Sequence, residues 1–420
     1  MHDRKTTVRE RGTRRSATPI RVLVAGPVTE SGGLARIARL TAGGFAPTDV
    51  APAVCDTSKD TPSDRSLVRA IVSHLRRVAR FAGAVVRHKP HIVHLHTCSY
   101  RTFERTILDC VICTLLNRPY VLHVHGGLFE QYLDGQRGWR RRRVIWALRS
   151  AKRVIVVGRA WRTALTRQVA GLSVEVLHNA VGQEASDLIA DTPPPGATGA
   201  GHTALPDAHS DTVRVRGGGV LFVGDLSEVK RPEDLIVAYA SLPRRQRTRF
   251  PLTLVGGGDA RRTSLIKRLA AAVAPGDPVY FTGCVRPAAV AQLMRTADLV
   301  VIPSRAEGLP LVLLEAMHAS AAIVVTDVGA VREVVSDGVN AVIVSPQDAQ
   351  QLALAMVRLL RDDARRDALA RAARGRAAAF CPDVFRTRLL GIWREVAAEV
   401  QPTHDPPLPR LASASLRFLL

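Results

Sequence analysis

The chain has few aromatic residues, no long apolar run and no cluster of cysteines. Phe, Trp and Tyr make up 5% of its 420 residues, which offers little surface on which nucleic-acid bases can stack. Its longest apolar runs, such as residues 154–157 and 299–302, fall far short of the roughly 20 residues that a membrane span needs. The six cysteines are scattered and complete no zinc-ligand pattern. The composition therefore excludes a membrane-spanning protein and argues against a specific nucleic-acid binder.

The start of the chain lacks the apolar segment of a secretory signal. Residues 1–18 are basic and polar, and we expect a disordered tail there and at residues 401–420, which contain four prolines. Cys110 and Cys113 have redox spacing, but they lie in an apolar helical stretch, where two small residues three apart share a face. We therefore expect a cytoplasmic protein with reduced cysteines.

Acidic residues are too few to balance the basic ones. The chain has 59 Lys and Arg against 37 Asp and Glu, a net charge of +22. Residues 1–190 hold 31 basic and 14 acidic side chains (+17), whereas residues 191–420 hold 28 and 23 (+5). Such a charge attracts nucleic acid, an acidic membrane face or phosphorylated substrates. An arginine-rich surface that is merely solvated is the alternative.

The densest basic stretch is residues 137–153, where eight Arg and Lys occur with no acid among them. Trp139 and Trp146 are interspersed, which is typical of an amphipathic helix at a membrane surface. A solvated face with core tryptophans is the alternative. We expect the stretch to contact an anionic membrane, so that the protein is peripheral on the inner face of the plasma membrane.

Short apolar runs that end in glycine, proline or a small polar residue alternate with helical patterns along the chain. Such runs occupy residues 20–25, 91–95, 120–124 and 154–157, and roughly six more follow between 220 and 345. Continuous apolar runs are typical of buried parallel strands. The pattern predicts an α/β protein with two doubly wound Rossmann-like domains that face each other across a cleft.

The expected domains are residues 19–190 and 220–383. Residues 191–219 are rich in Pro, Gly, Ala and Thr without periodicity, so we expect a linker or insertion there. Residues 384–400 have an amphipathic pattern that predicts a last helix.

Glycines follow the predicted strands of the second domain. Gly224 ends one strand, and Gly256 and Gly257 end the next. Such backbone can approach a phosphate closely, although a tight strand-to-helix turn also needs glycine. Lys230 stands just before Pro232, which fits the start of a helix. A lysine there can neutralise a diphosphate as a point charge, or it is simply solvated.

The most informative stretch is residues 304–316, with Glu307 in a loop after a strand and Glu315 eight residues later. Pro310 can open a helix in which Leu311 and its apolar neighbours surround Glu315. A carboxylate buried among them must be paired or hydrogen-bonded, and ribose hydroxyls are suitable donors. The amides that open this helix favour an anion in front of it. A lone glutamate satisfied within its own domain is the alternative.

With these motifs, residues 220–345 resemble the donor-binding domain of glycosyltransferase family 4, the retaining nucleotide-sugar enzymes of the glycosyltransferase-B fold. Glu307 and Glu315 match the family's paired glutamates, and Lys230 matches the lysine that contacts the donor diphosphate. The resemblance places Glu307 near the sugar, where it binds hydroxyls. It also implies that the helix at 384–400 packs back on the first domain.

The first domain resembles the family more loosely, as an acceptor-binding domain would. Gly32 and Gly33 resemble the glycine pair near the donor phosphate, and His125 resembles a residue that contacts the sugar. His94 and His123 fit a structural role better. The catalytic residues implied are Glu307, His125 and Lys230, and the implied donor-binding residues are Gly32, Gly33, Gly224, Lys230, Gly256, Gly257, Val285, Gly308, Leu309, Pro310, Leu311 and Glu315.

The chain departs from the family pattern at one position. Many members carry an arginine after the first glycine of the donor domain, where it helps the lysine to hold the diphosphate, and this chain has Asp225. An acidic side chain there repels phosphates unless it points away. Arg231 and Arg305 are candidate substitutes.

We therefore predict a retaining hexosyltransferase that moves a sugar from a nucleoside-diphosphate sugar to a glycan or lipid-linked acceptor in cell-surface polysaccharide or glycolipid synthesis. No Asp-x-Asp stands beside a predicted cleft strand, and the resemblance implies metal independence. No cofactor is expected, because the nucleotide sugar is a substrate. The alternatives are a non-catalytic, phosphorylase or epimerase member of the same fold, or a basic nucleic-acid-binding protein.

Overall fold

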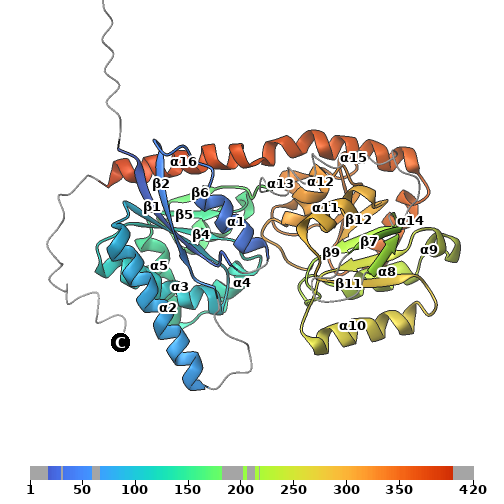
Figure 1. Cartoon of the computed structure of the whole chain (residues 1–420), viewed down its shortest axis with the longest axis horizontal. Helices are drawn as coiled ribbons and strands as arrows, with labels where there is room; N and C mark the ends of the chain where they lie inside the picture. Colours follow the sequence, from blue (N-terminus) through green and yellow to red (C-terminus); the bar gives the residue numbers. More distant parts are fainter. Residues whose placement is uncertain are drawn as a thin grey trace, which may run out of the picture.

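The protein has two lobes that lie side by side and are bridged along one edge by its last long helices (Figure 1). The structure, a computed structural model of the chain, describes residues 18–29, 32–58, 67–181, 202–205, 213–216 and 218–400. Nearly all of the two predicted tails and most of the predicted linker lie outside the described residues. Within the linker, β7 (His202–Leu205) and β8 (Val213–Arg216) form an antiparallel pair that the irregular composition did not predict.

The first lobe is built on a parallel six-stranded sheet in the order β2-β1-β3-β4-β5-β6. Its strands are β1 (Ile20–Gly26), β2 (Val50–Asp56), β3 (Ile92–Thr97), β4 (Tyr120–Val124), β5 (Arg153–Val156) and β6 (Val174–Val176). The sequence missed β2 and β6. β2 is an edge strand with several exposed residues and a proline, and β6 has only three residues, so neither forms a continuous apolar run.

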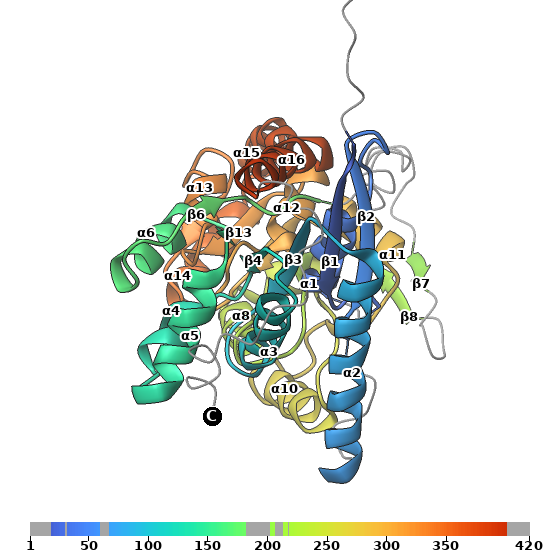
Figure 2. The same ribbon diagram turned by 90° about the vertical axis from the view of Figure 1, so that its left-hand side faces the viewer.

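Helices cover both faces of this sheet (Figure 2). They are α1 (Gly33–Ala42), α2 (Leu67–His88), α3 (Arg101–Leu115), α4 (Phe129–Asp134), α5 (Gly138–Ser150) and α6 (Arg159–Gln168). One apolar core joins the sheet to α2, α3 and α5, and a second joins the opposite face to α1 and the last helix of the chain. Cys110 and Cys113 are both free and buried in the first of these cores, as their helical spacing predicts.

The second lobe repeats the architecture with a parallel sheet in the order β11-β10-β9-β12-β13-β14. Its strands are β9 (Val220–Val223), β10 (Leu252–Val255), β11 (Val279–Gly283), β12 (Leu299–Ile302), β13 (Ile323–Thr326) and β14 (Val342–Val344). All six were predicted. The helices are α8 (Pro232–Ala240), α9 (Arg244–Arg249), α10 (Ala260–Val273), α11 (Pro287–Thr296), α12 (Leu311–His318), α13 (Val331–Val334), α14 (Ala349–Leu359) and α15 (Asp363–Ala377).

The chain crosses back to the first lobe at its end. A 3-10 turn (Ala378–Phe380) follows α15, and α16 (Pro382–Glu399) then lies over the first sheet (Figure 1). Phe385, Leu389 and Trp393 of α16 are buried against β1, β3 and α1. Among the described residues, no helix is long and apolar enough to cross a membrane.

Both sheets have a topological switch point, where neighbouring strands send their connections to opposite faces. The switch lies between β1 and β3 in the first sheet and between β9 and β12 in the second. Ligands of such sheets bind outside the carboxyl ends of the strands at this point. The confirmed prediction of two doubly wound sheets therefore directs attention to the loops that follow β1, β3, β9 and β12.

Candidate functional site

The two lobes meet in direct contact at the loops after β4 and β12. A Cβ added to Gly127 would lie 2.5 Å from the carbonyl carbon of Glu307, and one added to Gly308 would lie 2.4 Å from the carbonyl oxygen of His125. The Asn179 side chain donates a hydrogen bond to the Leu309 carbonyl at 2.9 Å. These contacts bring His125, Glu307, Gly308 and Leu309, all predicted site residues, to one junction.

Glu307 is held by two donors of its own lobe. Lys230 Nζ lies 2.5 Å from Glu307 Oε1, and Ser304 Oγ donates to the same oxygen at 2.7 Å. Lys230 follows β9 and Glu307 follows β12, so the pair sits at the switch point of the second sheet. Both side chains are largely shielded from solvent. The structure therefore puts two of the three predicted catalytic side chains in contact.

Glu315 has a partner from the other lobe. It is buried on α12, and its carboxylate forms an ion pair with the Arg36 guanidinium of α1. Burial raises the pKa of Glu315, and the Arg36 cation partly opposes that rise. The sequence predicted a buried, paired carboxylate, but it did not identify Arg36.

The first turns of α1 and α12 face each other at this junction. Gly32 and Gly33 begin α1, and a Cβ on Gly33 would contact the Leu311 side chain at 3.4 Å. Pro310 caps α12, which begins at Leu311 as predicted. Free amides and the positive end of the helix dipole make each terminus favourable for an anion.

The predicted glycines of the second lobe lie at adjoining strand ends. The Gly224 amide donates to the Val255 carbonyl at 2.9 Å, and a Cβ on Gly256 would lie 1.9 Å from the Gly224 carbonyl oxygen. Gly256 also has a φ of +130°, which disfavours any side chain. Gly257 adjoins Cys284, next to the partly buried Val285. These glycines therefore let two strand-end loops pack backbone to backbone.

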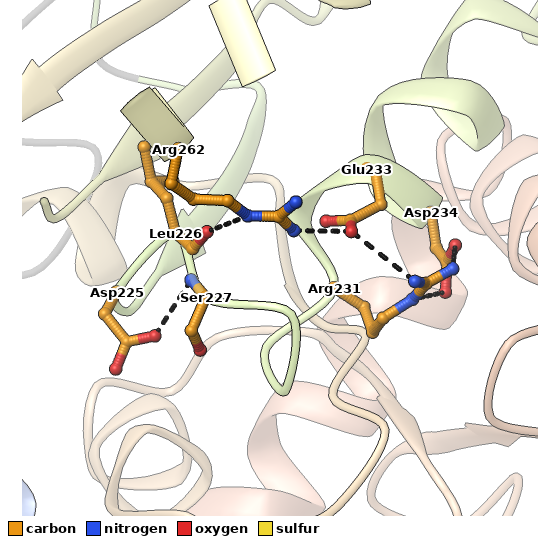
Figure 3. A network of polar contacts seen from close by, with 7 residues as sticks. All are labelled: Asp225, Leu226, Ser227, Arg231, Glu233, Asp234 and Arg262. Carbon is orange, nitrogen blue, oxygen red and sulfur yellow. Dashed lines mark hydrogen bonds and ion pairs between the residues drawn. The ribbon is translucent and has the colours of Figure 1, made fainter. Parts of the chain in front are cut away.

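The two candidate substitutes for the missing arginine differ in their surroundings. The Arg231 guanidinium is engaged by Asp234 and Glu233, and Glu233 also binds Arg262 (Figure 3). Asp225 turns to its own loop, where its carboxylate accepts a hydrogen bond from the Ser227 amide at 3.1 Å. Arg305 is exposed, and its backbone amide bonds the Val229 carbonyl.

Four histidines at the ends of β3 and β4 form a cluster. His96 Nδ1 lies 2.9 Å from His125 Nε2, and His94 Nε2 lies 3.2 Å from His123 Nδ1. Burial lowers the pKa of all four, to about 3 for His94 and His125. His125 is therefore neutral at physiological pH, and its ring already bonds His96 and interacts with the Asn179 side chain.

Three of these histidines come close enough to raise the question of a metal. The nitrogens of His94, His96 and His123 lie within 4.8 Å of one another. The Trp393 indole, which can only donate, bonds His94 Nδ1 at 3.2 Å. The proton of neutral His94 therefore sits on Nε2 and points to His123 Nδ1. These two nitrogens already share a proton, so the arrangement fits a hydrogen-bonded chain better than a set of metal ligands.

The sequence did not identify Arg36, Ser304 or Trp393 as partners at these strand ends, although Ser304 begins the informative stretch 304–316. The one clue to Arg36 in the sequence is its place, one turn after the predicted glycine pair on the same helix. Trp393 stands in the predicted last helix, but its histidine partner is far away in the sequence.

Comparison with known proteins gives matches in both lobes. Residues 32–184 match glycosyltransferase family 4, and residues 216–376 match glycosyl transferases group 1. An alpha-D-kanosaminyltransferase of Streptomyces kanamyceticus is 30% identical over 297 residues, which cover 67% of this chain and 72% of that protein. A D-inositol 3-phosphate glycosyltransferase of Frankia alni is 38% identical over 168 residues. That match spans 38% of this chain and only 41% of the relative's own length.

Solved structures show the same fold. Sucrose-phosphate synthase from Thermosynechococcus elongatus superimposes with a TM-score of 0.68 at 19% identity, covering 91% of this chain and all of that one. HepE from Anabaena, solved with UDP-glucose, gives 0.63 at 19% identity over 90% of this chain and all of that one. Two Rossmann-like sheets joined at their switch points and matched in both lobes are the glycosyltransferase-B fold, and the chain belongs to glycosyltransferase family 4.

Proposed function

We propose that the protein is a retaining, metal-independent glycosyltransferase that moves a sugar from a nucleoside-diphosphate sugar to a glycan or lipid-linked acceptor. The observation that carries the proposal is the contact of Lys230 with Glu307 at the point where both lobes meet. It supplies a cation and a carboxylate side by side, as the departure of a diphosphate from a sugar requires.

Bond cleavage places negative charge on the leaving diphosphate and positive charge on the anomeric carbon. Lys230 and the amides at the starts of α1 and α12 offset the first charge. Glu307, held by Ser304, accepts hydrogen bonds from sugar hydroxyls and supplies negative character near the anomeric carbon. The backbone carbonyl of His125 lies across the junction next to Gly308, and its neutral ring can orient a sugar hydroxyl when it exchanges one of its present partners. No covalent nucleophile is assigned.

The lobes also touch at a second point, which would help to keep water from the reacting groups. Glu333 of the second lobe accepts a hydrogen bond from the Arg159 amide at 2.5 Å and contacts His178 Nε2 at 3.0 Å. Together with the contacts of Gly127 and Gly308, these close the junction on a second side. A closed junction favours transfer to an acceptor over loss of the sugar to water.

The acceptor has a candidate pocket in the first lobe. A partly enclosed pocket of about 170 Å³ opens beside the ends of β1 and β3. Two buried atoms on residues that line it, Arg77 Nε and His96 Nε2, have no hydrogen-bond partner among the described residues. Arg77 also binds both oxygens of Asp109, at 2.9 and 3.0 Å. Such a mixture of donors and acceptors suits a hydroxyl-rich acceptor group.

A membrane surface next to this lobe would present a lipid-linked acceptor. Val68, Ile71, Val72 and Leu75 of α2 are 39–70% exposed and recur at helical spacing. On α5, Trp139 is 61% exposed, with the guanidiniums of Arg143 and Arg140 at 5.1 and 5.6 Å from its ring. Apolar side chains among arginines favour an anionic bilayer. We therefore place the protein in the cytoplasm, bound to the inner membrane face, in cell-surface polysaccharide or glycolipid synthesis.

The proposal is tested by two measurements. Purified protein is screened by thermal shift against UDP, GDP and ADP and then assayed for transfer or hydrolysis of the matching sugars. We expect one diphosphate to raise the melting temperature by mass action. If none binds and no nucleotide sugar is consumed, the proposed donor class is wrong. Flotation with anionic liposomes at low and high salt tests membrane docking separately, and absence of binding at low salt would refute it.

A further inference from the structure

Glu307 and Glu315 are each paired with a cation, but the two cations come from different lobes. Glu307 contacts Lys230 of its own lobe, and Glu315 contacts Arg36 of the opposite lobe. The proposed function gives Lys230 a role at the diphosphate, whereas Arg36 has none. Among the described residues, Arg36 is the cation that pairs with one of these two glutamates across the junction.

The position of Arg36 is set by α1. Its amide bonds the Gly32 carbonyl at 3.2 Å, so it stands one turn into the helix that Gly32 and Gly33 begin. Side chains of a helix lean back toward its start. Arg36 therefore projects over the first turn of α1 toward the first turn of α12, where the two positive helix ends converge on the same space.

The proposed diphosphate site needs more positive charge than Lys230 supplies. Asp225 stands where the family resemblance implies an arginine, and its side chain is turned to Ser227. Arg231 is held by two carboxylates (Figure 3). Arg305, the other candidate, has an exposed side chain. Lys230 offsets one of the two or more negative charges of a nucleoside diphosphate. A second cation at the junction would balance the site.

We propose that Arg36 is that second cation and that it exchanges partners when the donor binds. The ribose hydroxyls take over the Glu315 carboxylate, and the released Arg36 guanidinium binds the diphosphate beside the amides of Gly32 and Gly33. Lys230 makes the parallel exchange from Glu307 to the diphosphate. Each buried carboxylate thus keeps a partner in both states, which avoids the cost of an unpaired buried charge. This inference rests on the proposed function.

A purely structural role makes a different prediction. If Arg36 only joined the lobes through Glu315, its loss would alter the affinity for a nucleoside and for its diphosphate by the same factor. If Arg36 binds the diphosphate, its loss weakens the diphosphate selectively. Loss of the competing ion pair also leaves Glu315 free for ribose, so nucleoside affinity stays the same or rises.

The test is a titration of the full chain with a diphosphate, its monophosphate and its nucleoside, using whichever of UDP, GDP and ADP binds the parent protein. For Arg36→Gln we expect the diphosphate to bind ten- to hundredfold more weakly, on the scale of one lost charge-assisted hydrogen bond. The affinity for the nucleoside should change by less than about threefold. Arg36→Lys keeps a point charge and should recover most of the affinity. Arg388→Gln, an exposed site on α16, is the charge-matched control.

Equal losses of affinity for the diphosphate and the nucleoside would refute the role of Arg36 without affecting the proposed class of donor. So would an unchanged diphosphate affinity in Arg36→Gln. If the parent protein binds none of the three diphosphates, the proposed function fails first. A circular dichroism melt of each variant guards against unfolding as the cause of weaker binding.

Discussion

The first lobe brings neutral histidines and the cation of Arg36 to the junction, whereas the second lobe brings the ion pair of Lys230 with Glu307. His96 and His125 stand at the ends of β3 and β4, and burial lowers the pKa of each far below neutrality. Lys230 and Glu307 stand at the equivalent ends of β9 and β12 and contact each other at 2.5 Å. Two sheets of nearly the same topology thus place different chemical groups at the junction.

Under the proposed function, this difference reflects the two kinds of chemical group that meet at the junction. A diphosphate is charged and needs cations, which stay charged only where partners and some solvent remain. A sugar or polyol is neutral and needs fixed hydrogen bonds, which buried neutral rings provide. The excess basic charge of the first half does not contradict this, since the arginines of α2 and α5 other than the buried Arg77 are exposed or partly exposed. Charge at the surface and charge at the junction are therefore separate features.

The largest expected effect comes from breaking the ion pair of the second lobe. Lys230→Ala and Glu307→Ala should each lower the rate of sugar transfer by about 10²–10³-fold, the scale for losing one group that stabilises the transition state. The measurement is kcat/KM for donor consumption. Lys267→Ala, which removes an exposed lysine of α10, is the control and should keep full activity. Parent-like rates in both site variants would show that these residues are not catalytic.

Lowering the pH should destabilise the first lobe more than the second. Six first-lobe histidines, His74, His91 and the four of the cluster, have folded-state pKa values below the ordinary value of 6.5, whereas His318 is the one described histidine of the second lobe with a lowered pKa. Below pH 6.5 the unfolded chain binds protons that the folded chain does not. Stability is therefore complete above that pH and falls as the pH decreases, by about 1.4 kcal/mol per pH unit for each buried histidine.

Hydrogen exchange followed by mass spectrometry at pH 7.5 and 5.5 measures this difference. We expect β3 and β4 to lose protection at pH 5.5 while β9 and β12 keep theirs. Equal loss in both sheets would show that the histidines do not control acid stability.

Sequence reasoning succeeded in the second lobe because its signals are local. Six continuous apolar runs end in glycine or small polar residues, so each strand could be located, and Glu307 and Glu315 lie within one short stretch. It failed where structure depends on distant partners. β2 breaks its apolar pattern with Pro52 at the sheet edge, and no local pattern could show that Arg36 meets Glu315 or that Trp393 meets His94.

The contact between the lobes can be tested at one glycine. Gly127→Ala would put a methyl group 2.5 Å from the Glu307 backbone, so the lobes must separate slightly. We expect about a tenfold loss of transfer, since small misplacements of reacting groups have large effects, together with a higher share of donor hydrolysis. Gly83→Ala in α2, where a Cβ meets nothing within 4 Å, should leave activity unchanged. An unchanged ratio of transfer to hydrolysis in Gly127→Ala would contradict the closed junction.

The smallest expected effect concerns the cluster of four histidines. Trp393→Phe keeps the ring in the core but removes the donor to His94 Nδ1, and it should lower the free energy of unfolding by about 1–2 kcal/mol. Trp161→Phe is the matched control, because the buried Trp161 Nε1 has no hydrogen-bond partner among the described residues, so its removal should cost little. Urea denaturation of both variants measures the difference. Equal losses would mean that Trp393 contributes packing alone. A larger loss for Trp393 would show that α16, which reaches the first lobe from the second, stabilises the buried histidines through its hydrogen bond to His94.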